Sequence, residues 1–226
     1  MANNIDLYIE LQKVFYSHGF KLFLVGGTVR NCLLNEPLDD MDLVTDATPN
    51  EMREFLSGNY RFERYGCVSL KIEGVNFDIT TLREENNYQD KRHPEDIRFT
   101  KDLEKDVRRR DFTINALYMD EKGQIYDYVG GQNDLKNHLL KMVGDPNKRI
   151  KEDPLRIIRA LRFSLTYNLI ISEELKEAIH RNIGLLDSLN PEKIKQDLRK
   201  IKCEDKEKIE RLFDEFSIHH LLNVLE

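Results

Sequence analysis

The pattern of apolar residues changes near residue 134, and this change constrains the fold more than any other feature of the sequence. Before it, short apolar runs bounded by glycines and turn residues indicate strands mixed with helices. After it, these runs vanish and helical periodicity takes over. We therefore predict an α+β domain with a mixed β-sheet over residues 1–145, followed by an all-α domain over residues 146–226.

Most elements of the first domain can be placed from local patterns. Thr48-Pro49-Asn50-Glu51 is typical of a helix start, because Thr48 can cap the helix and Glu51 can complete a capping box. The polar stretch 84–100 contains His93-Pro94 and is expected to be a loop. The other expected elements are a helix at 1–18, a buried strand at 21–26, a short helix at 28–34, a strand at 41–46, two strands within 68–82 that turn at Glu73-Gly74, and a hairpin within 114–129.

Composition limits the class of protein. With 40% hydrophobic and 34% charged residues the chain is expected to be soluble and globular. It has no apolar run of roughly 20 residues that could cross a membrane, and its start, MANNIDLYIELQK, does not resemble a signal peptide. Cys32, Cys67 and Cys203 are too far apart for a zinc or disulfide pattern, so a cytoplasmic location is expected.

The net charge of −6 is not that of a generally basic nucleic-acid binder. Two local tracts, 156–162 and 193–202, are nevertheless strongly basic. Since phosphates respond to local charge and not to the average, binding to RNA stays open.

Asp40 and Asp42 are the first candidate site residues. In an extended segment, residues two apart point to the same side, so the two carboxylates share one face. At about 4 Å their repulsion is about 4 kcal/mol at an effective dielectric constant near 20. A pair of this kind suits Mg²⁺, and two such ions could activate a 3′-hydroxyl and stabilise a leaving pyrophosphate. Alone, the same pair also fits an acidic surface turn.

Gly26-Gly27 and Arg30 precede these aspartates. Paired glycines after a strand let backbone N–H groups approach a phosphate, and an arginine can hold a triphosphate with two hydrogen bonds. The glycines alone also fit a tight turn between strand and helix. The order of strand, Gly-Gly, Arg and Asp-x-Asp is much more specific than any of its parts.

This order resembles the first motif of the class II tRNA CCA-adding enzymes and the related poly(A) polymerases, in the polymerase-β-like nucleotidyltransferase superfamily. The resemblance extends over roughly residues 20–203 and implies a polymerase-β-like head followed by a helical neck. It also implies that Asp40 and Asp42 hold the metal and that Gly27 and Arg30 bind the nucleotide. Asn31 departs from the family, which usually has Asp there, so a charge is missing at this position.

The stretch RRRDFTINALYMD at 108–120 resembles the sugar-recognising motif of the same family. The resemblance implies that Arg110 and Asp111 lie at the nucleotide, with Asp111 near the ribose hydroxyls. An aspartate can accept a hydrogen bond from a 2′-hydroxyl, which distinguishes ribonucleotides from deoxyribonucleotides. Without the other motifs, the three arginines would fit an ordinary basic turn.

The stretch EDPLRIIRALRFSLTYNL at 152–169 resembles the family's amino-acid template for the incoming base. By this resemblance Asp153 and Arg156 pair with the Watson–Crick edge of C or A, and Arg159 and Arg162 extend a basic face towards base or phosphate. The spacing places all four on one helix face. In isolation it also fits a salt-bridged amphipathic helix.

Three further features have weaker signals. The stretch REENNYQDKRHPEDIRFTKDLEKDVRRRDF at 83–112 resembles a flexible loop that CCA-adding relatives need for the final A, and it contains Tyr88, Asp90, Arg92, His93 and Pro94. Asp78 lies on an expected strand and is a possible third carboxylate. The helix expected at 191–203 resembles one that supports the template helix, with Asp197 where the family more often has Glu.

Together the motifs predict an enzyme that adds CCA to the tRNA 3′ end from CTP and ATP with two Mg²⁺ ions. The alternatives are a poly(A) polymerase, an enzyme that adds only A or part of CCA, and a catalytically inactive RNA-binding module. By the resemblance, body and tail domains that grip tRNA would follow the neck, so weak tRNA affinity with retained nucleotide binding is expected. The sequence leaves monomer and dimer open.

Overall fold

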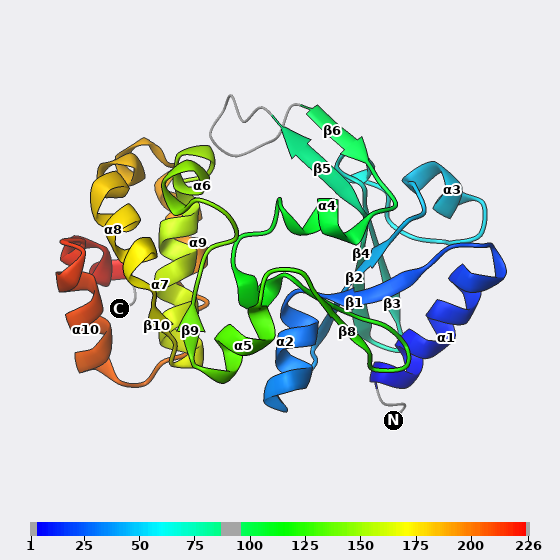
Figure 1. Cartoon of the computed structure of the whole chain (residues 1–226), viewed down its shortest axis with the longest axis horizontal. Helices are drawn as coiled ribbons and strands as arrows, with labels where there is room; N and C mark the ends of the chain where they lie inside the picture. Colours follow the sequence, from blue (N-terminus) through cyan, green and yellow to red (C-terminus); the bar gives the residue numbers. More distant parts are fainter. Residues whose placement is uncertain (1–3, 87–95, 225–226) are drawn as a thin grey trace. The chain divides into compact units, whose positions relative to one another are not determined.

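The computed structural model describes residues 4–86 and 96–224, and it separates into two compact units (Figure 1). The first unit contains the described residues up to 132, and the second begins at residue 133. Residues 133–145 therefore pack with the second unit, while the division into 1–145 and 146–226 stays a prediction about domains. Mixed sheet in the first part and helices in the second confirm the expected fold class.

A mixed six-stranded sheet forms the centre of the first unit. Its strand order is β3-β4-β2-β1-β7-β8, with β2 and β4 parallel and the other neighbours antiparallel. Every residue of β1 is buried, as its continuous apolar sequence predicts for a central strand. The strands are β1 (Leu22–Val25), β2 (Asp40–Thr45), β3 (Cys67–Ile72), β4 (Val75–Thr81), β7 (Leu117–Met119) and β8 (Ile125–Asp127).

Helices α1 (Asn4–Ser17), α2 (Gly27–Leu34) and α3 (Pro49–Arg53) confirm the expected helical segments around these strands. Helix α1 buries an apolar stripe that packs into the core of the sheet. At α3 the Thr48 hydroxyl accepts from the backbone N–H of Glu51, and the Glu51 carboxylate accepts from the backbone N–H of Thr48. This completes the predicted capping box.

The expected loop at 84–100 is wrong in part. Strands β5 (Arg83–Asn86) and β6 (Asp96–Phe99) pair antiparallel there, and α4 (Leu103–Val107) packs against β5 (Figure 1). Strand β5 carries charged side chains that form ion pairs, Arg83 with Glu85 and Glu85 with Arg109, and hydropathy therefore gave no strand signal. The intervening Tyr88, Asp90, Arg92, His93 and Pro94 lie outside the described residues.

The second unit is mainly helical around α7 (Leu155–Tyr167), whose buried side chains include Ile157, Ile158 and Leu161. The expected absence of strands is wrong in detail, because β9 (Leu139–Leu140) and β10 (Ile170–Ile171) form a short parallel pair. Two-residue strands are too short for a periodic signal. The other helices are α5 (Gly131–Lys136), which begins in the first unit, α6 (Pro146–Glu152), α8 (Glu173–Asn182), α9 (Pro191–Leu198) and α10 (Lys206–Glu215).

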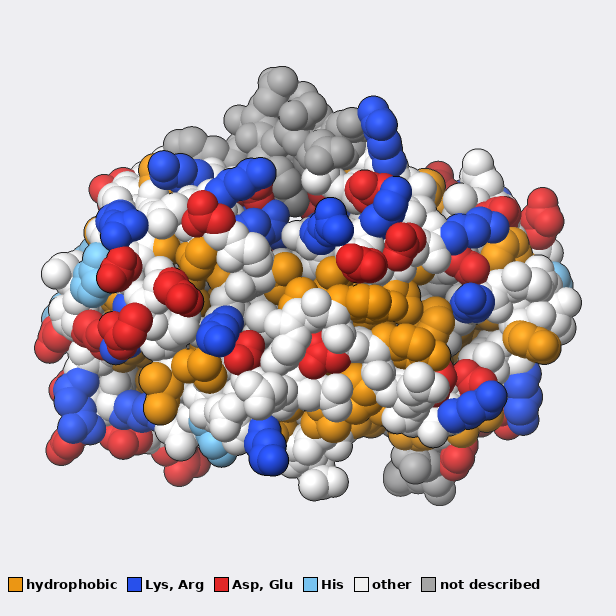
Figure 2. All heavy atoms as spheres, in the orientation of Figure 1, with side chains coloured by type: hydrophobic (Ala, Val, Ile, Leu, Met, Phe, Trp, Pro, Cys, Tyr) orange, Lys and Arg blue, Asp and Glu red, His pale blue; other side chains and the backbone are white. Residues whose placement is uncertain are grey.

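Charged side chains of both signs are interspersed on the face of the molecule drawn in Figure 2. Figure 2 shows Lys and Arg side chains scattered among Asp and Glu on the face drawn, without a broad field of one sign. No helix in the described ranges is both long enough and apolar enough to cross a membrane.

Candidate active site

Three carboxylates lie on the exposed face of the sheet where β2 and β4 run side by side. Along β2 the side chains of Met41 and Leu43 are buried, and Asp40 and Asp42 alternate with them on the other face. The parallel register places Asp42 directly beside Asp78 of β4. The structure thus places the predicted pair on one face, and it adds Asp78 as their neighbour.

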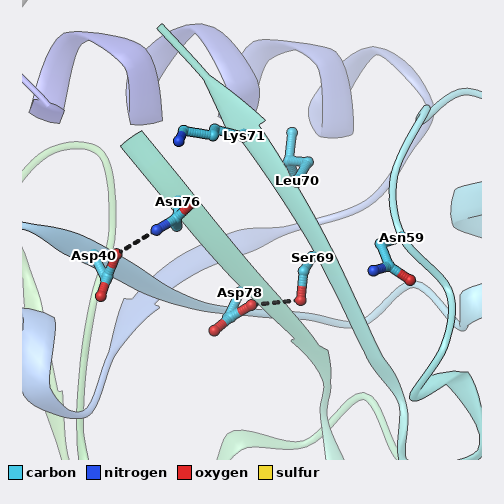
Figure 3. Close-up of a pocket in the computed structure, with 7 residues that line it drawn as sticks. All are labelled: Asp40, Asn59, Ser69, Leu70, Lys71, Asn76 and Asp78. Atoms are coloured by element: carbon cyan, nitrogen blue, oxygen red, sulfur yellow. Dashed lines mark hydrogen bonds between the residues drawn. The ribbon is translucent and has the colours of Figure 1, made fainter. Parts of the chain in front are cut away.

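Polar neighbours orient two of these carboxylates. The Asn76 amide donates to Asp40 Oδ1 at 2.8 Å, and the Ser69 hydroxyl donates to Asp78 Oδ1 at 2.5 Å. Figure 3 shows Asp40 and Asp78 pointing to the same side of the strands. They border a pocket of about 350 Å³, lined by Asp40, Asn59, Ser69, Leu70, Lys71, Asn76 and Asp78.

The electrostatic environment of the Asp42 carboxylate is unfavourable to its negative charge. Loss of hydration raises the pKa of its carboxyl group, and the neighbouring Asp78 and Asp40 raise it further. The guanidinium groups of Arg110 and Arg30 lower the pKa but do not compensate. A cation beside Asp42 would relieve this unfavourable charge.

The Gly26-Gly27 turn brings backbone close to Asp42. Gly26 caps α2 with φ +63° and ψ −126°, a conformation available essentially to glycine alone. A Cβ atom on Gly27 would lie 3.5 Å from Asp42 Oδ2. The backbone N–H of Asp42 donates to the Thr28 hydroxyl at 2.8 Å, which fixes β2 to the start of α2. The turn therefore keeps a narrow space open between α2 and the carboxylate.

Arg30 is directed towards this turn although only 5% of the residue is exposed. Its guanidinium donates to Asn115 Oδ1 and, at 2.9 Å, to Asn31 Oδ1. Asn31 also donates to the carbonyl of Pro37 at 3.1 Å. Asn31 therefore orients Arg30 through its neutral amide, without the charge that Asp would bring. Sequence reasoning missed Asn115, although it lies inside the quoted motif at 108–120.

Arg110 is the basic residue on the other side of Asp42. Its Nε and Nη2 donate to Asp106 Oδ2 at 3.1 and 2.8 Å, and Nε also donates to the Tyr118 hydroxyl at 3.0 Å. Its Nη1 lies 3.9 Å from the position of a Cβ on Gly26. Asp111 follows with a half-buried side chain. Sequence reasoning missed Asp106, whose only signal is the i, i+4 spacing to Arg110.

The predicted base-reading residues lie at the start of α7 and along it. Asp153 is extended and joins α6 to α7, and its Oδ1 accepts from the backbone N–H of Leu155 at 3.1 Å. Arg156 is buried and donates to the carbonyl of Arg149 at 2.5 Å and to Glu152 at 3.4 Å. Glu152 ends α6, and α7 starts directly after Pro154.

The remaining basic residues of α7 differ in their surroundings. Arg162 forms an ion pair with Asp197 of α9 and stacks over the Phe163 ring, 4.6 Å from its centroid. This contact agrees with the expected supporting role of α9. Arg159 is half-buried. A nucleotide contact by Asp153, Arg156, Arg159 or Arg162 stays a prediction.

The side chains that could act as metal ligands can be compared with what a Mg²⁺ ion requires. In the described part of the chain, no group of three or more His, Cys, Asp or Glu residues is arranged to hold a metal ion. Mg²⁺, however, usually takes one or two protein carboxylates and completes its shell with water and substrate phosphates. Asp40 and Asp42 fit this limited role, and the raised pKa of Asp42 favours a cation beside it.

A mixed sheet with paired carboxylates beside a glycine turn and a helix start defines the head of a polymerase-β-like nucleotidyltransferase. The Poly A polymerase head domain model matches residues 22–141, which is more than half of the chain. The chain belongs to this family.

Relatives and solved structures agree with this assignment. The chain is 40% identical over 200 residues to the CCA-adding enzyme of Lactobacillus helveticus, covering 87% of the chain and 50% of the relative. It is 40% identical over 185 residues to that of Staphylococcus haemolyticus, covering 81% and 46%. The Bacillus stearothermophilus CCA-adding enzyme in complex with CTP superimposes with a TM-score of 0.86 at 28% identity, covering 96% of the chain and 53% of that structure. The chain thus spans about half the length of the relatives it matches.

Proposed function

We propose that the chain carries the catalytic head and neck of an enzyme that adds C and A to the 3′ end of tRNA from CTP and ATP. The observation that carries this proposal is that Asp40, Asp42 and Asp78 lie together on one face of the sheet, with Arg30 and Arg110 close enough to lower the pKa of Asp42. The names of the relatives support the choice of substrates. A solved tRNA nucleotidyltransferase with a primer tRNA and an incoming ATP analogue adds support, with a TM-score of 0.76 at 27% identity.

The proposed reaction is in-line attack of the RNA 3′-hydroxyl on the α-phosphate of the incoming nucleotide, with pyrophosphate leaving. Mg²⁺ held by Asp40 and Asp42 would supply charge neutralisation at the phosphates and a more acidic 3′-hydroxyl. Arg30 and the backbone at Gly27 bind the triphosphate. Asp78 adds negative charge on the β4 side of Asp42.

Sugar and base selection form the second part of the proposal. Arg110 and Asp111 contact the sugar, and Asp153 and Arg156 read the base, with Arg159 and Arg162 extending the basic face of α7. Arg156 donates to the end of α6 in the described structure, so reading a base requires it to exchange those hydrogen bonds for the base edge. A wrong base would lose these hydrogen bonds, and its binding would be weaker by roughly 1–3 kcal/mol for each pair of hydrogen bonds lost.

A poly(A) polymerase is the second candidate, because the matching family model describes a poly(A) polymerase head. Incorporation of labelled CTP and ATP into tRNA lacking its CCA end separates the two. CTP followed by ATP supports CCA addition, whereas ATP alone on any RNA supports the poly(A) enzyme. Tight RNA binding without incorporation would instead support an inactive module.

The metal role has its own test. Asp42→Ala should abolish incorporation with little loss of folding, since the side chain lies on the exposed face of β2. Asp39→Ala is the matched control, because Asp39 is an exposed acid in the same segment and lies outside the β2–β4 pairing. Activity that survives Asp42→Ala shows that the assignment is wrong.

A further inference from the structure

A buried carboxylate, Asp106 in α4, lies four residues before Arg110 in the chain. It is 0% exposed, and both of its carboxylate oxygens accept hydrogen bonds. Oδ2 accepts from Arg110 Nε and Nη2 and from the Tyr118 hydroxyl, the last at 2.8 Å. Oδ1 accepts from Arg109 Nε at 2.8 Å and from the backbone N–H of Arg83 at 3.0 Å.

These five hydrogen bonds connect Asp106 to two different parts of the first unit. Through Oδ2 the carboxylate holds one edge of the Arg110 guanidinium, and this leaves Nη1 on the side of Gly26. Through Oδ1 it holds the first residue of β5 and also Arg109, which lies 3.6 Å from Glu85 Oε1. The same Glu85 oxygen accepts from Arg83 Nε at 2.7 Å. One carboxylate thus fixes both the Arg110 side chain and the base of the β5–β6 hairpin.

Charge explains why an aspartate is needed here. Arg110 also interacts with Asp42, a member of the carboxylate cluster. Two anions therefore compete for one guanidinium, and the charge-assisted hydrogen bonds of Asp106 retain it. Without the Asp106 charge, attraction to Asp42 would draw Arg110 across the space where the nucleotide phosphates are proposed to bind.

We propose that Asp106 is a positioning residue for nucleotide binding, which acts by holding the Arg110 guanidinium beside Gly26 against the attraction of Asp42. This inference rests on the proposed function for the identity of the nucleotide. It concerns the affinity for nucleotide, so it can be tested by binding alone, without incorporation.

Asp106→Asn is the main variant, because Asn keeps the shape but supplies one neutral acceptor in place of two charged ones. We expect the Kd for CTP to rise about tenfold or more, and the KM for CTP to rise in parallel, with kcat changed less than about threefold. Arg108→Ala is the matched control, since Arg108 is the adjacent arginine, is exposed and pairs only weakly with Glu104 at 3.6 Å. Its Kd should match that of the wild type.

A double-mutant cycle separates positioning from a general loss of folding. If Asp106 acts through Arg110, the effects of Asp106→Asn and Arg110→Lys on the Kd for CTP are not additive, and the double variant is little worse than the worse single one. Additive effects would overturn the proposal. So would a Kd for Asp106→Asn equal to that of the wild type.

Tyr118→Phe serves where Asp106→Asn does not fold. It removes one donor to Asp106 and one acceptor for Arg110 while the charges remain, and we expect a two- to fivefold weaker Kd for CTP. An unchanged Kd would overturn the proposal. Wild-type protein that binds CTP but incorporates nothing would refute the proposed function and leave this test intact, whereas wild-type protein that does not bind CTP refutes both.

Discussion

The crowding of carboxylates around Asp42 predicts that removing its charge stabilises the protein while it destroys the site. Adjacent strands are about 4.8 Å apart, so Asp42 and Asp78 repel each other by about 3.5 kcal/mol at a dielectric constant of 20 and by about 0.9 kcal/mol at 80. Asp42 is accessible to solvent, and Arg110 and Arg30 offset part of the repulsion, so the lower figure is the better guide. We expect Asp42→Asn to be more stable by about 1 kcal/mol at pH 7 without metal, a rise of about 2–4 °C in the thermal midpoint.

The pH dependence follows from the raised pKa of Asp42. Its folded pKa lies above its unfolded one, so ionisation of the folded protein costs stability at neutral pH. As the pH falls through the folded pKa, the wild type becomes protonated and this cost disappears. The wild type and Asp42→Asn should therefore converge in stability on acidification and differ most near pH 7.

Thermal unfolding of both proteins between pH 4 and pH 8, in EDTA and in excess Mg²⁺, tests this reasoning. At 100 times its Kd, a ligand adds about 2.7 kcal/mol of stability, so Mg²⁺ should stabilise the wild type more than Asp42→Asn and reverse their order. Asp39→Asn should show no such crossover. If Asp42→Asn is the less stable protein in EDTA at pH 7, or if the difference does not vary with pH, the reasoning fails.

Three smaller predictions concern single contacts. Gly26→Ala should destabilise the first unit by about 1–3 kcal/mol, because an L side chain is strained at this φ and ψ, and it should weaken CTP binding; unchanged thermal midpoint and Kd would contradict this. Asp197→Asn should cost about 1–3 kcal/mol by weakening the largely buried pair with Arg162, as measured by urea unfolding, and a change below 0.5 kcal/mol would count against the pair. Thr48→Ala should cost about 1 kcal/mol through loss of the cap, whereas Thr48→Ser, which keeps the hydroxyl, should cost much less.

Sequence patterns predicted those parts of the fold in which hydrophobicity and backbone geometry act together. The alternation around Met41 and Leu43 indicated both a strand and the face that carries Asp40 and Asp42. The Gly-Gly turn indicated an approach of backbone to a ligand, and the structure places Gly27 against Asp42. These features depend on residues close together in the chain, so local rules suffice.

Features that depend on buried charge escaped prediction. In strand β5 the side chains of Arg83 and Glu85 are largely buried and form an ion pair. A hydropathy pattern treats such charged residues as part of a loop. The direction of Arg156 depends mainly on the carbonyl of Arg149 in α6, which lies outside the stretch 152–169. The pairing of Asp42 with Asp78 needed the parallel register of β2 and β4, which the sequence between them does not specify.

Asp42 and Asp106 show why residue type alone could not separate functional from structural carboxylates. Burial by itself would raise the pKa of both groups. At Asp106, Arg109 and Arg110 outweigh burial and hold the pKa well below its ordinary value, so this charge stabilises the fold at neutral pH and its contribution is lost only in acid. At Asp42, neighbouring acids act in the same direction as loss of hydration, and Arg110 and Arg30 offset only part of this effect. Arg110 interacts with both carboxylates. Asp106, which accepts hydrogen bonds at both of its oxygens, therefore holds Arg110 against the attraction of Asp42. On this opposition rests our proposal that Asp106 positions Arg110 and that Asp42 holds metal and substrate.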